Sequence, residues 1–193
     1  MAGEGDIKAW RRRERERLIA ARLAASAEQY ARWSGAIEQR LTAFLAISTA
    51  RTIGLYWPHR AEFDPRPLAE RLIAEGWRAA LPAIAARNAP LEYRLWQPGM
   101  AMSDGLHGIP TPEARQVVLP DLLLVPMVGF DAANYRLGYG GGYFDRTLAA
   151  AEPRPVAIGI AFELSRIESI FPGDHDIAMD VVVTEAALQE KPR

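Results

Sequence analysis

The segment from Asp121 to Val128 constrains the fold more than any other part of the chain. It reads Asp-Leu-Leu-Leu-Val-Pro-Met-Val and is apolar almost throughout. A strand with one solvent-facing side alternates between apolar and polar residues, whereas an unbroken apolar run predicts a strand buried on both faces. Such strands belong to parallel sheets that helices cover on both sides, so an α/β fold is expected.

Along the rest of the chain, predicted strands alternate with predicted helices. Asp64-Pro65 predicts the start of a helix, with Asp64 as N-cap, and Gly76 predicts its end. Between them, these signals favour an α/β arrangement with a largely parallel sheet. The predicted strands are Thr52 to Trp57, Trp77 to Leu81, Leu91 to Trp96 (near an edge), Val156 to Ala161 and Val181 to Thr184, and a short helix is predicted near Tyr143 to Ala151.

Residues 6–46 predict two helices that precede this core. Alanine and arginine dominate there, and Ser26 followed by Gln29 forms a capping-box pattern at the start of the second helix. At helical spacing, Arg11, Arg15, Leu18 and Arg22 share one face of the first helix. We therefore expect a single domain over residues 1–193, with the helices of 6–46 packed on a core of 51–186.

Composition excludes several classes of function. The 193 residues include no cysteine, so disulfides, thiolate catalysis and cysteine zinc sites are excluded. A net charge of −1 offers no general attraction for nucleic acid, and no stretch reaches the roughly 20 apolar residues of a membrane span. We expect a soluble cytoplasmic protein, monomeric or weakly dimeric, whose partners are small molecules. Residues 97–116 are rich in proline and glycine and predict an irregular loop.

A glycine-rich segment follows the buried strand and precedes the short helix. It runs Arg136-Leu-Gly-Tyr-Gly-Gly-Gly-Tyr-Phe-Asp-Arg146, and it lacks both the Gly-Lys-Ser/Thr of the Walker motif and a clean dinucleotide fingerprint. Glycines allow a ligand to approach the backbone, and the N-terminus of the next helix favours phosphate. Arg136 offers a two-pronged contact to phosphate oxygens. The alternative is a tight turn in which the glycines serve only backbone geometry.

Asp145 lies directly after these glycines. A carboxylate beside phosphates requires a cation between them, and Mg²⁺ bound by one or two carboxylates plus phosphates is the usual arrangement. Asp180, just before the strand of Val181, is a candidate second carboxylate. Its alternative is a capping or turn residue.

The run from Pro126 to Arg146 resembles the signature of the 5-formyltetrahydrofolate cyclo-ligase family, and the resemblance extends in order along nearly the whole chain. It implies a three-layer α/β/α fold related to ribose-5-phosphate isomerases and CoA transferases. It also implies an ATP- and Mg²⁺-dependent ligase that converts 5-formyltetrahydrofolate to 5,10-methenyltetrahydrofolate with release of ADP and phosphate. Asn134 departs from a common glycine and Phe144 from a common tyrosine.

The resemblance further implies roles for individual residues. Arg136 and Asp145 would be catalytic, and Asp145 and Asp180 would hold Mg²⁺. The folate would contact Trp57 and Glu62. Arg11 and Arg15 of the first helix would reach the nucleotide. ATP would contact Arg136, Leu137, Gly138, Tyr139, Gly140, Gly141, Gly142 and Tyr143, of which the last five would also border the folate.

A chemical hypothesis accompanies these roles. ATP would phosphorylate the formyl oxygen, after which the folate N10 would attack the activated carbon. Two other function classes stay open at this point. One is a sugar-phosphate isomerase or transferase that uses the glycine loop for its substrate's phosphate, and the other is a non-catalytic nucleotide-binding protein on a related fold.

Overall fold

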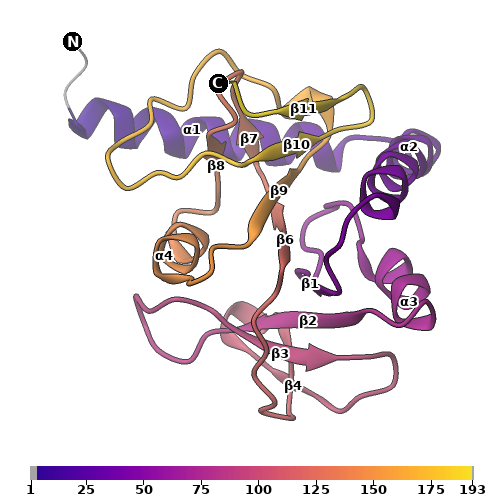
Figure 1. Ribbon diagram of the computed structural model, residues 1–193. Coiled ribbons are helices and arrows are strands. Elements are labelled where there is room, and N and C mark those ends of the chain that lie inside the picture. Colours follow the sequence, from indigo (N-terminus) through magenta and orange to yellow (C-terminus); the bar gives the residue numbers. More distant parts are fainter. Residues whose placement is uncertain (1–3, 193) are drawn as a thin grey trace.

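A seven-stranded sheet forms the centre of the chain in the computed structural model, which describes residues 4–192 (Figure 1). Its strand order is β11-β10-β9-β6-β1-β2-β3, and the five inner strands run parallel while β11 and β3 are antiparallel edges. The bounds are β1 Thr52–Gly54, β2 Arg78–Ala83, β3 Glu92–Trp96, β6 Leu122–Pro126, β9 Val156–Ile160, β10 Val181–Val183 and β11 Leu188–Glu190.

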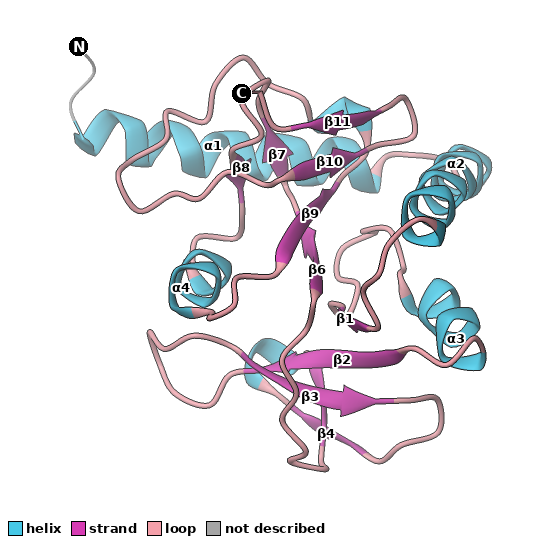
Figure 2. Ribbon diagram, viewed as in Figure 1, coloured by secondary structure: helices cyan, strands magenta, loops and turns pink. Residues whose placement is uncertain are grey.

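Strand β6 is buried on both faces, as its composition predicts. Leu122 and Leu124 join the core that helices α2 (Ala27–Ala46) and α3 (Arg66–Ala74) cover. Leu123 and Val125 join a second core on the opposite face, against helix α4 (Tyr143–Ala150). Figure 2 shows α2 and α3 together on one side of the sheet and α4 on the other. The expected three-layer α/β/α fold with a largely parallel sheet is therefore confirmed.

The order of the strands reverses between β1 and β6. From β1 the chain continues to its neighbour β2, whereas from β6 it continues to β9 on the other side. The loops that leave the carboxyl ends of β1 and β6 therefore diverge, and in open α/β sheets ligands bind in the crevice that this divergence creates. Tyr56 follows β1 and Pro126 ends β6, so these two segments mark the position of the crevice.

Helix α1 (Glu4–Leu23) crosses the end of the sheet from which these loops emerge. Its Leu18 is fully buried against Val128, Leu137 and Ile170. Ser26 and Gln29 form the predicted capping box at the start of α2: the serine hydroxyl accepts from the Gln29 N–H, and the glutamine side chain accepts from the Ser26 N–H. Within residues 4–192, no helix has the length and apolar character needed to cross a bilayer.

Two local predictions differ from the structure. Helix α3 begins at Arg66, with Pro65 rather than Asp64 at the N-cap position. The Asp64 carboxylate still accepts from the Arg66 N–H, which is the hydrogen bond expected of a capping side chain, and it also pairs with the Arg66 guanidinium. The predicted loop of 97–116 contains a small hairpin instead. It comprises β4 (Met102–Asp104), the 3-10 turn η1 (Leu106–Gly108) and β5 (Pro110–Pro112). Three further strands, β7 (Gly129–Phe130), β8 (Arg136–Leu137) and the edge strand β11, and the turn η2 (Glu163–Ser165) were also not predicted.

Candidate functional site

A cavity of about 940 Å³ lies at the switch point between β1 and β6. Segments far apart in the sequence form its walls: helix α1, the turn after β1, the β4–β5 hairpin, and the loop between β8 and α4. A volume of this size is in the range of small-molecule and cofactor sites. The lining residues divide into an apolar end and a charged, glycine-rich end.

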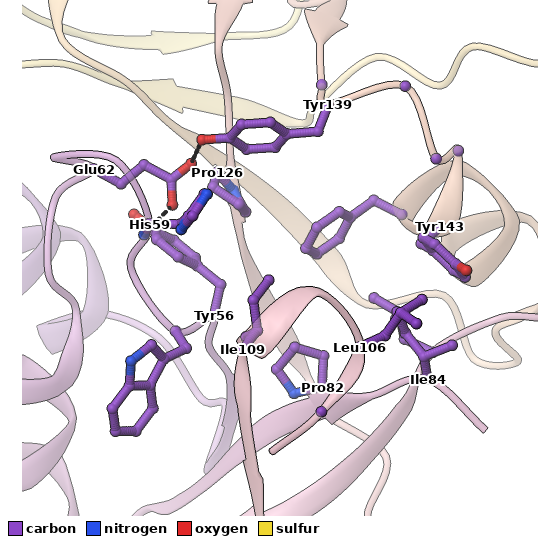
Figure 3. Close-up of a pocket in the computed structure, with 18 of the residues that line it drawn as sticks. Tyr56, His59, Glu62, Pro82, Ile84, Leu106, Ile109, Pro126, Tyr139 and Tyr143 are labelled. Carbon is purple, nitrogen blue, oxygen red and sulfur yellow. Dashed lines mark hydrogen bonds between the residues drawn. The ribbon is translucent and has the colours of Figure 1, made fainter. Parts of the chain in front are cut away.

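The apolar end lies between the sheet and the β4–β5 hairpin. Tyr56 and Trp57 come from the segment after β1, Pro82 from β2, and Leu106 and Ile109 from the hairpin. Figure 3 shows Pro82, Leu106 and Ile109 on the side of the cavity opposite Glu62 and Tyr139. Trp57, a predicted folate contact, thus lines the cavity, and the guanidinium of Arg66 stacks 4.3 Å from the centre of its ring. This end suits a flat, partly apolar ring system.

Glu62 is the one buried carboxylate at this end. It is 5% exposed, and its two oxygens accept from the Tyr139 hydroxyl at 2.6 Å and from the His59 backbone N–H at 2.9 Å. Burial raises the pKa of Glu62, while the Tyr139 hydrogen bond and the nearby Arg22 oppose that rise. The turn that carries it is strained, because Arg60 and Ala61 both have positive φ (49° and 57°). Strain of this kind is typical of functional sites, where surrounding contacts maintain it.

Arg22 anchors this turn from helix α1. Its Nε donates to the Arg60 carbonyl and its Nη2 to the Tyr139 hydroxyl, both at 2.9 Å. The Tyr139 hydroxyl therefore accepts from an arginine and donates to Glu62. Burial and the neighbouring Glu62 carboxylate raise the pKa of Tyr139, so the phenol stays protonated.

The glycine-rich loop wraps the other end of the cavity. Gly140 and Gly142 have positive φ (97° and 63°), a conformation that residues with a Cβ rarely adopt. Gly142 is the N-cap of α4 and makes no side-chain cap, so the first N–H groups of that helix need partners from elsewhere. Arg146, in α4, stabilises the loop by donating to the Gly141 carbonyl at 2.7 Å. Tyr143 and the loop backbone line the cavity.

Arg11 and Arg15 of α1 both line this charged end, as the sequence predicts. Arg15 donates to the Gly138 carbonyl at 2.7 Å, and burial together with the neighbouring Arg11 lowers its pKa. Arg11 contacts the loop between η2 and β10, where it pairs with Asp176 at 2.7 Å and donates to the Phe171 carbonyl. The two guanidiniums therefore place positive charge beside the glycine-rich loop.

Arg136 and Asp145 also meet at this end. They form an ion pair of 2.7 Å, and Asp145 accepts from the Ile177 N–H while Arg136 donates to the Ile177 carbonyl. Asp176, the preceding residue, lines the same cavity. Two carboxylates and three guanidiniums thus face one space. Among residues 4–192 no cluster of three or more His, Asp or Glu side chains forms a complete metal site.

Asp180, the expected second metal ligand, does not line the cavity. Its carboxylate pairs with Arg154 at 3.0 Å and accepts from the Ala157 N–H at 2.8 Å, which ties the start of β10 to β9. The structure therefore does not bring Asp180 together with Asp145. Asp180 is not a helix cap either; it lies in the bend before β10, and its carboxylate links that bend to β9.

Sequence reasoning missed Asp176, which lines the cavity, and Arg22, which contacts the lining residues Arg60 and Tyr139. A signal existed for Arg22, since it shares a helical face with Arg11 and Arg15. Asp176 lies in a loop whose path depends on the Arg11 contacts, so no local pattern distinguishes it from its neighbours. The hairpin residues Leu106 and Ile109 were hidden in a segment whose prolines and glycines predict irregular structure.

Comparison with known proteins agrees with these features. The profile of the 5-formyltetrahydrofolate cyclo-ligase family matches residues 7–185. Proteins named 5-formyltetrahydrofolate cyclo-ligase are similar in sequence: that of Mycolicibacterium smegmatis is 32% identical over 145 residues (70% of this chain, 74% of the relative), and that of Escherichia coli K12 is 29% identical over 158 residues (78% and 87%).

Solved structures agree as well. The 5,10-methenyltetrahydrofolate synthetase of Aquifex aeolicus superposes with a TM-score of 0.81 at 27% identity, covering 93% of this chain and 92% of that one. The synthetase of Mycoplasma pneumoniae, at 24% identity and a TM-score of 0.74 over 91% and 98% of the two chains, shows the same fold. The chain belongs to the 5-formyltetrahydrofolate cyclo-ligase family.

Proposed function

We propose that this protein cyclises 5-formyltetrahydrofolate to 5,10-methenyltetrahydrofolate and consumes ATP in doing so. The observation that carries the proposal is that a single cavity holds both a buried carboxylate in an apolar end and a glycine loop with basic residues at the other end. The first end suits a pterin and the second a triphosphate, so the two substrates would meet between them.

The pterin would occupy the apolar end. Trp57 and Tyr56 offer aromatic surface, and the hairpin residues Leu106 and Ile109 add apolar side chains to the same cavity. A pterin presents several N–H donors along one edge, and a carboxylate accepts two of them side by side. Each oxygen of Glu62 has one donor from the protein and keeps lone pairs for a ligand. Glu62 would therefore fix the orientation of the ring.

The triphosphate would lie along the glycine loop. The backbone N–H groups of 140–142 and the N-terminus of α4 favour anions, and Arg15 and Arg136 add charge-assisted donors. Each such contact contributes roughly 1.5 to 3 kcal/mol. Because Arg136 pairs with Asp145, a phosphate that engages Arg136 would leave Asp145 available for a cation.

Magnesium fits the donor set of this end. Mg²⁺ keeps several waters and takes one or two carboxylates plus substrate phosphates, so a complete protein cage is not required. Asp145 would hold the ion, and Asp176 is the other carboxylate at this end of the cavity among the residues that the structure describes. When bound, the ion supplies neutralisation of the charge on the transferred phosphoryl group.

The chemistry follows from the weak reactivity of a formamide. The formyl oxygen would attack the γ-phosphorus of ATP, forming an O–P bond as the bond to ADP breaks. N10 would then attack the formyl carbon and lose its proton, and the C–O bond would break to release inorganic phosphate. Arg136 and the loop amides would stabilise the negative charge, and no side-chain nucleophile is needed. The remaining rate acceleration would come from the orientation of the two substrates within one cavity.

The test is an absorbance assay for the methenyl product. The purified protein, 5-formyltetrahydrofolate, Mg²⁺ and ATP are mixed, with parallel reactions that lack ATP or contain a non-hydrolysable ATP analogue. Growth of the methenyl band only with hydrolysable ATP supports the proposal. No product, together with isomerisation of a sugar phosphate, would instead support the isomerase alternative. Nucleotide binding without any turnover would support a non-catalytic protein.

A further inference from the structure

Arg22 is a buried arginine that the proposed chemistry does not use. Its side chain and that of Glu62 are each only 4% exposed, and their charged groups approach to 3.7 Å. Burying a guanidinium costs free energy unless its donors find good partners. Arg22 makes such contacts with three different segments, through the Arg60 carbonyl, the Met127 carbonyl and the Tyr139 hydroxyl.

We infer that Arg22 is a positioning residue, which holds the Glu62 carboxylate in the orientation that receives the reduced pterin. The inference rests on the proposed function, since it takes Glu62 to be the pterin acceptor. Arg22 itself would not touch the folate. It would act through the Arg60 backbone on one side and the Tyr139 hydroxyl on the other.

The first route runs through the strained turn. Arg60 and Ala61 both adopt the left-handed conformation, which costs a residue with a Cβ on the order of 1–3 kcal/mol unless the surroundings compensate. The Nε–H of Arg22 satisfies the Arg60 carbonyl in the middle of that turn. Glu62 lies two residues after Arg60, so the Arg22 contact fixes the position of the Glu62 backbone.

The second route runs through Tyr139. Its hydroxyl accepts from Arg22 at 2.9 Å and donates to Glu62 Oε1 at 2.6 Å, and successive hydrogen bonds of this kind polarise one another. Glu62 Oε2 accepts from the His59 N–H. Both carboxylate oxygens are therefore oriented before any ligand is present, and Figure 3 shows Glu62 and Tyr139 meeting at one edge of the cavity.

The charge of Arg22 also favours the ionised form of Glu62. Burial raises the pKa of Glu62, and Arg22 opposes that rise. Loss of the guanidinium would leave the desolvation of the carboxylate less compensated, so its pKa would rise further. The other titratable or charged groups that surround Glu62 are Tyr139 from the glycine loop, Tyr30 from α2, Tyr56 from the segment after β1, and His59, Arg60 and Asp64 from its own turn.

ATP binding should depend on Arg22 much less. The glycine loop has other attachments, since Arg15 donates to the Gly138 carbonyl and Arg146 to the Gly141 carbonyl. Arg136 is fixed separately by Asp145 and Ile177. Loss of Arg22 should therefore weaken folate binding much more than ATP binding.

The test is equilibrium titration of the full-length protein with 5-formyltetrahydrofolate and, separately, with ATP and Mg²⁺. For Arg22→Met, the folate Kd should rise at least about tenfold, the loss expected of one charge-assisted contact, while the ATP Kd changes less than about threefold. Arg22→Lys keeps the charge but loses the forked contact, so its folate Kd should be intermediate. Arg17→Met is the matched control, because Arg17 lies on the same helix and pairs only with Glu14 through exposed contacts.

The pH dependence separates positioning from a merely structural role. As the pH is lowered, folate affinity should fall when Glu62 becomes protonated. The midpoint of this fall should lie at a higher pH for Arg22→Met than for the unchanged protein, whereas a loss of stability alone would not move the midpoint. If Arg22→Met does not fold, Arg22→Lys and Tyr139→Phe carry the comparison, and both should weaken folate more than ATP. Unchanged folate affinity and midpoint, or equal losses for both substrates, would overturn the inference. Failure of the unchanged protein to bind 5-formyltetrahydrofolate would overturn the proposed function and the inference together.

Discussion

The guanidinium of Arg136 and the carboxylate of Asp145 form a 2.7 Å ion pair inside the cavity, with Asp145 at the start of α4. The carboxylate is thus held beside the glycine-rich loop by an arginine that, under the proposed function, would itself bind phosphate. Under the proposed function, this pair would place a cation ligand and a phosphate ligand next to each other without leaving either charge uncompensated.

Asp145→Asn is expected to reduce kcat at least about 100-fold, because the amide would neither hold Mg²⁺ well nor balance Arg136. The fold should persist, since asparagine can still accept from the Ile177 N–H. Steady-state kinetics at several Mg²⁺ concentrations, with circular dichroism as a check of folding, measure both effects. Turnover close to that of the unchanged enzyme would remove Asp145 from the metal role.

Asp180→Asn is the matched comparison for that variant. Asp180 contacts Arg154 and the Ala157 N–H and does not line the cavity, so kcat should change less than about threefold. Stability should fall by about 1 kcal/mol through the weakened tie between β9 and β10. A loss of kcat as large as that of Asp145→Asn would instead support the metal role that the sequence suggested for Asp180.

If Glu62 is the pterin acceptor, as proposed, folate binding should depend on pH in a defined direction. Burial raises the pKa of Glu62 above the ordinary value of 4.5. The proposed contact requires the ionised form, because only the carboxylate accepts two pterin N–H groups. Folate affinity should be full above the raised pKa and should fall as the pH drops through it. Stability should change in the opposite sense, because the fold favours the protonated group and loses that contribution as the pH rises through the folded-state pKa.

Titration of folate binding and of the melting temperature across this pH range tests both trends. Glu62→Gln serves as the control, since it cannot ionise. It should bind folate more weakly than the unchanged protein at neutral pH and without the same pH dependence. Parallel pH profiles for Glu62→Gln and the unchanged protein would show that another group titrates.

The fold was largely predictable because its determinants are local. The unbroken apolar run ending at Val128 predicted a strand buried on both faces, and Ser26 with Gln29 predicted a helix start. The site was less predictable, because its geometry depends on contacts between distant segments. Asp180 sits at a strand start that looked suitable for a ligand, yet the loop that Arg11 holds brings Asp176 to the cavity instead. No short-range pattern carries that information.

Gly142→Ala is expected to destabilise the protein. Gly142 has φ 63° at the N-cap of α4, and a residue with a Cβ pays about 1–2 kcal/mol in that conformation. For a chain of this length, that corresponds to a melting temperature lower by roughly 2–8 °C. Gly138→Ala is the matched control, because a Cβ there meets open space and its φ is not positive. Equal melting temperatures for the two variants would contradict the strained-cap explanation.

The fate of the formyl oxygen distinguishes phosphorylation of the formyl group from other routes to the methenyl product. 5-Formyltetrahydrofolate carrying heavy oxygen in the formyl group is converted with ATP and Mg²⁺, and the inorganic phosphate is analysed by mass spectrometry. If the formyl oxygen attacks the γ-phosphorus, the heavy oxygen will appear in the phosphate, one atom for each methenyl group formed. Recovery of the heavy oxygen in water, with unlabelled phosphate, would contradict the mechanism.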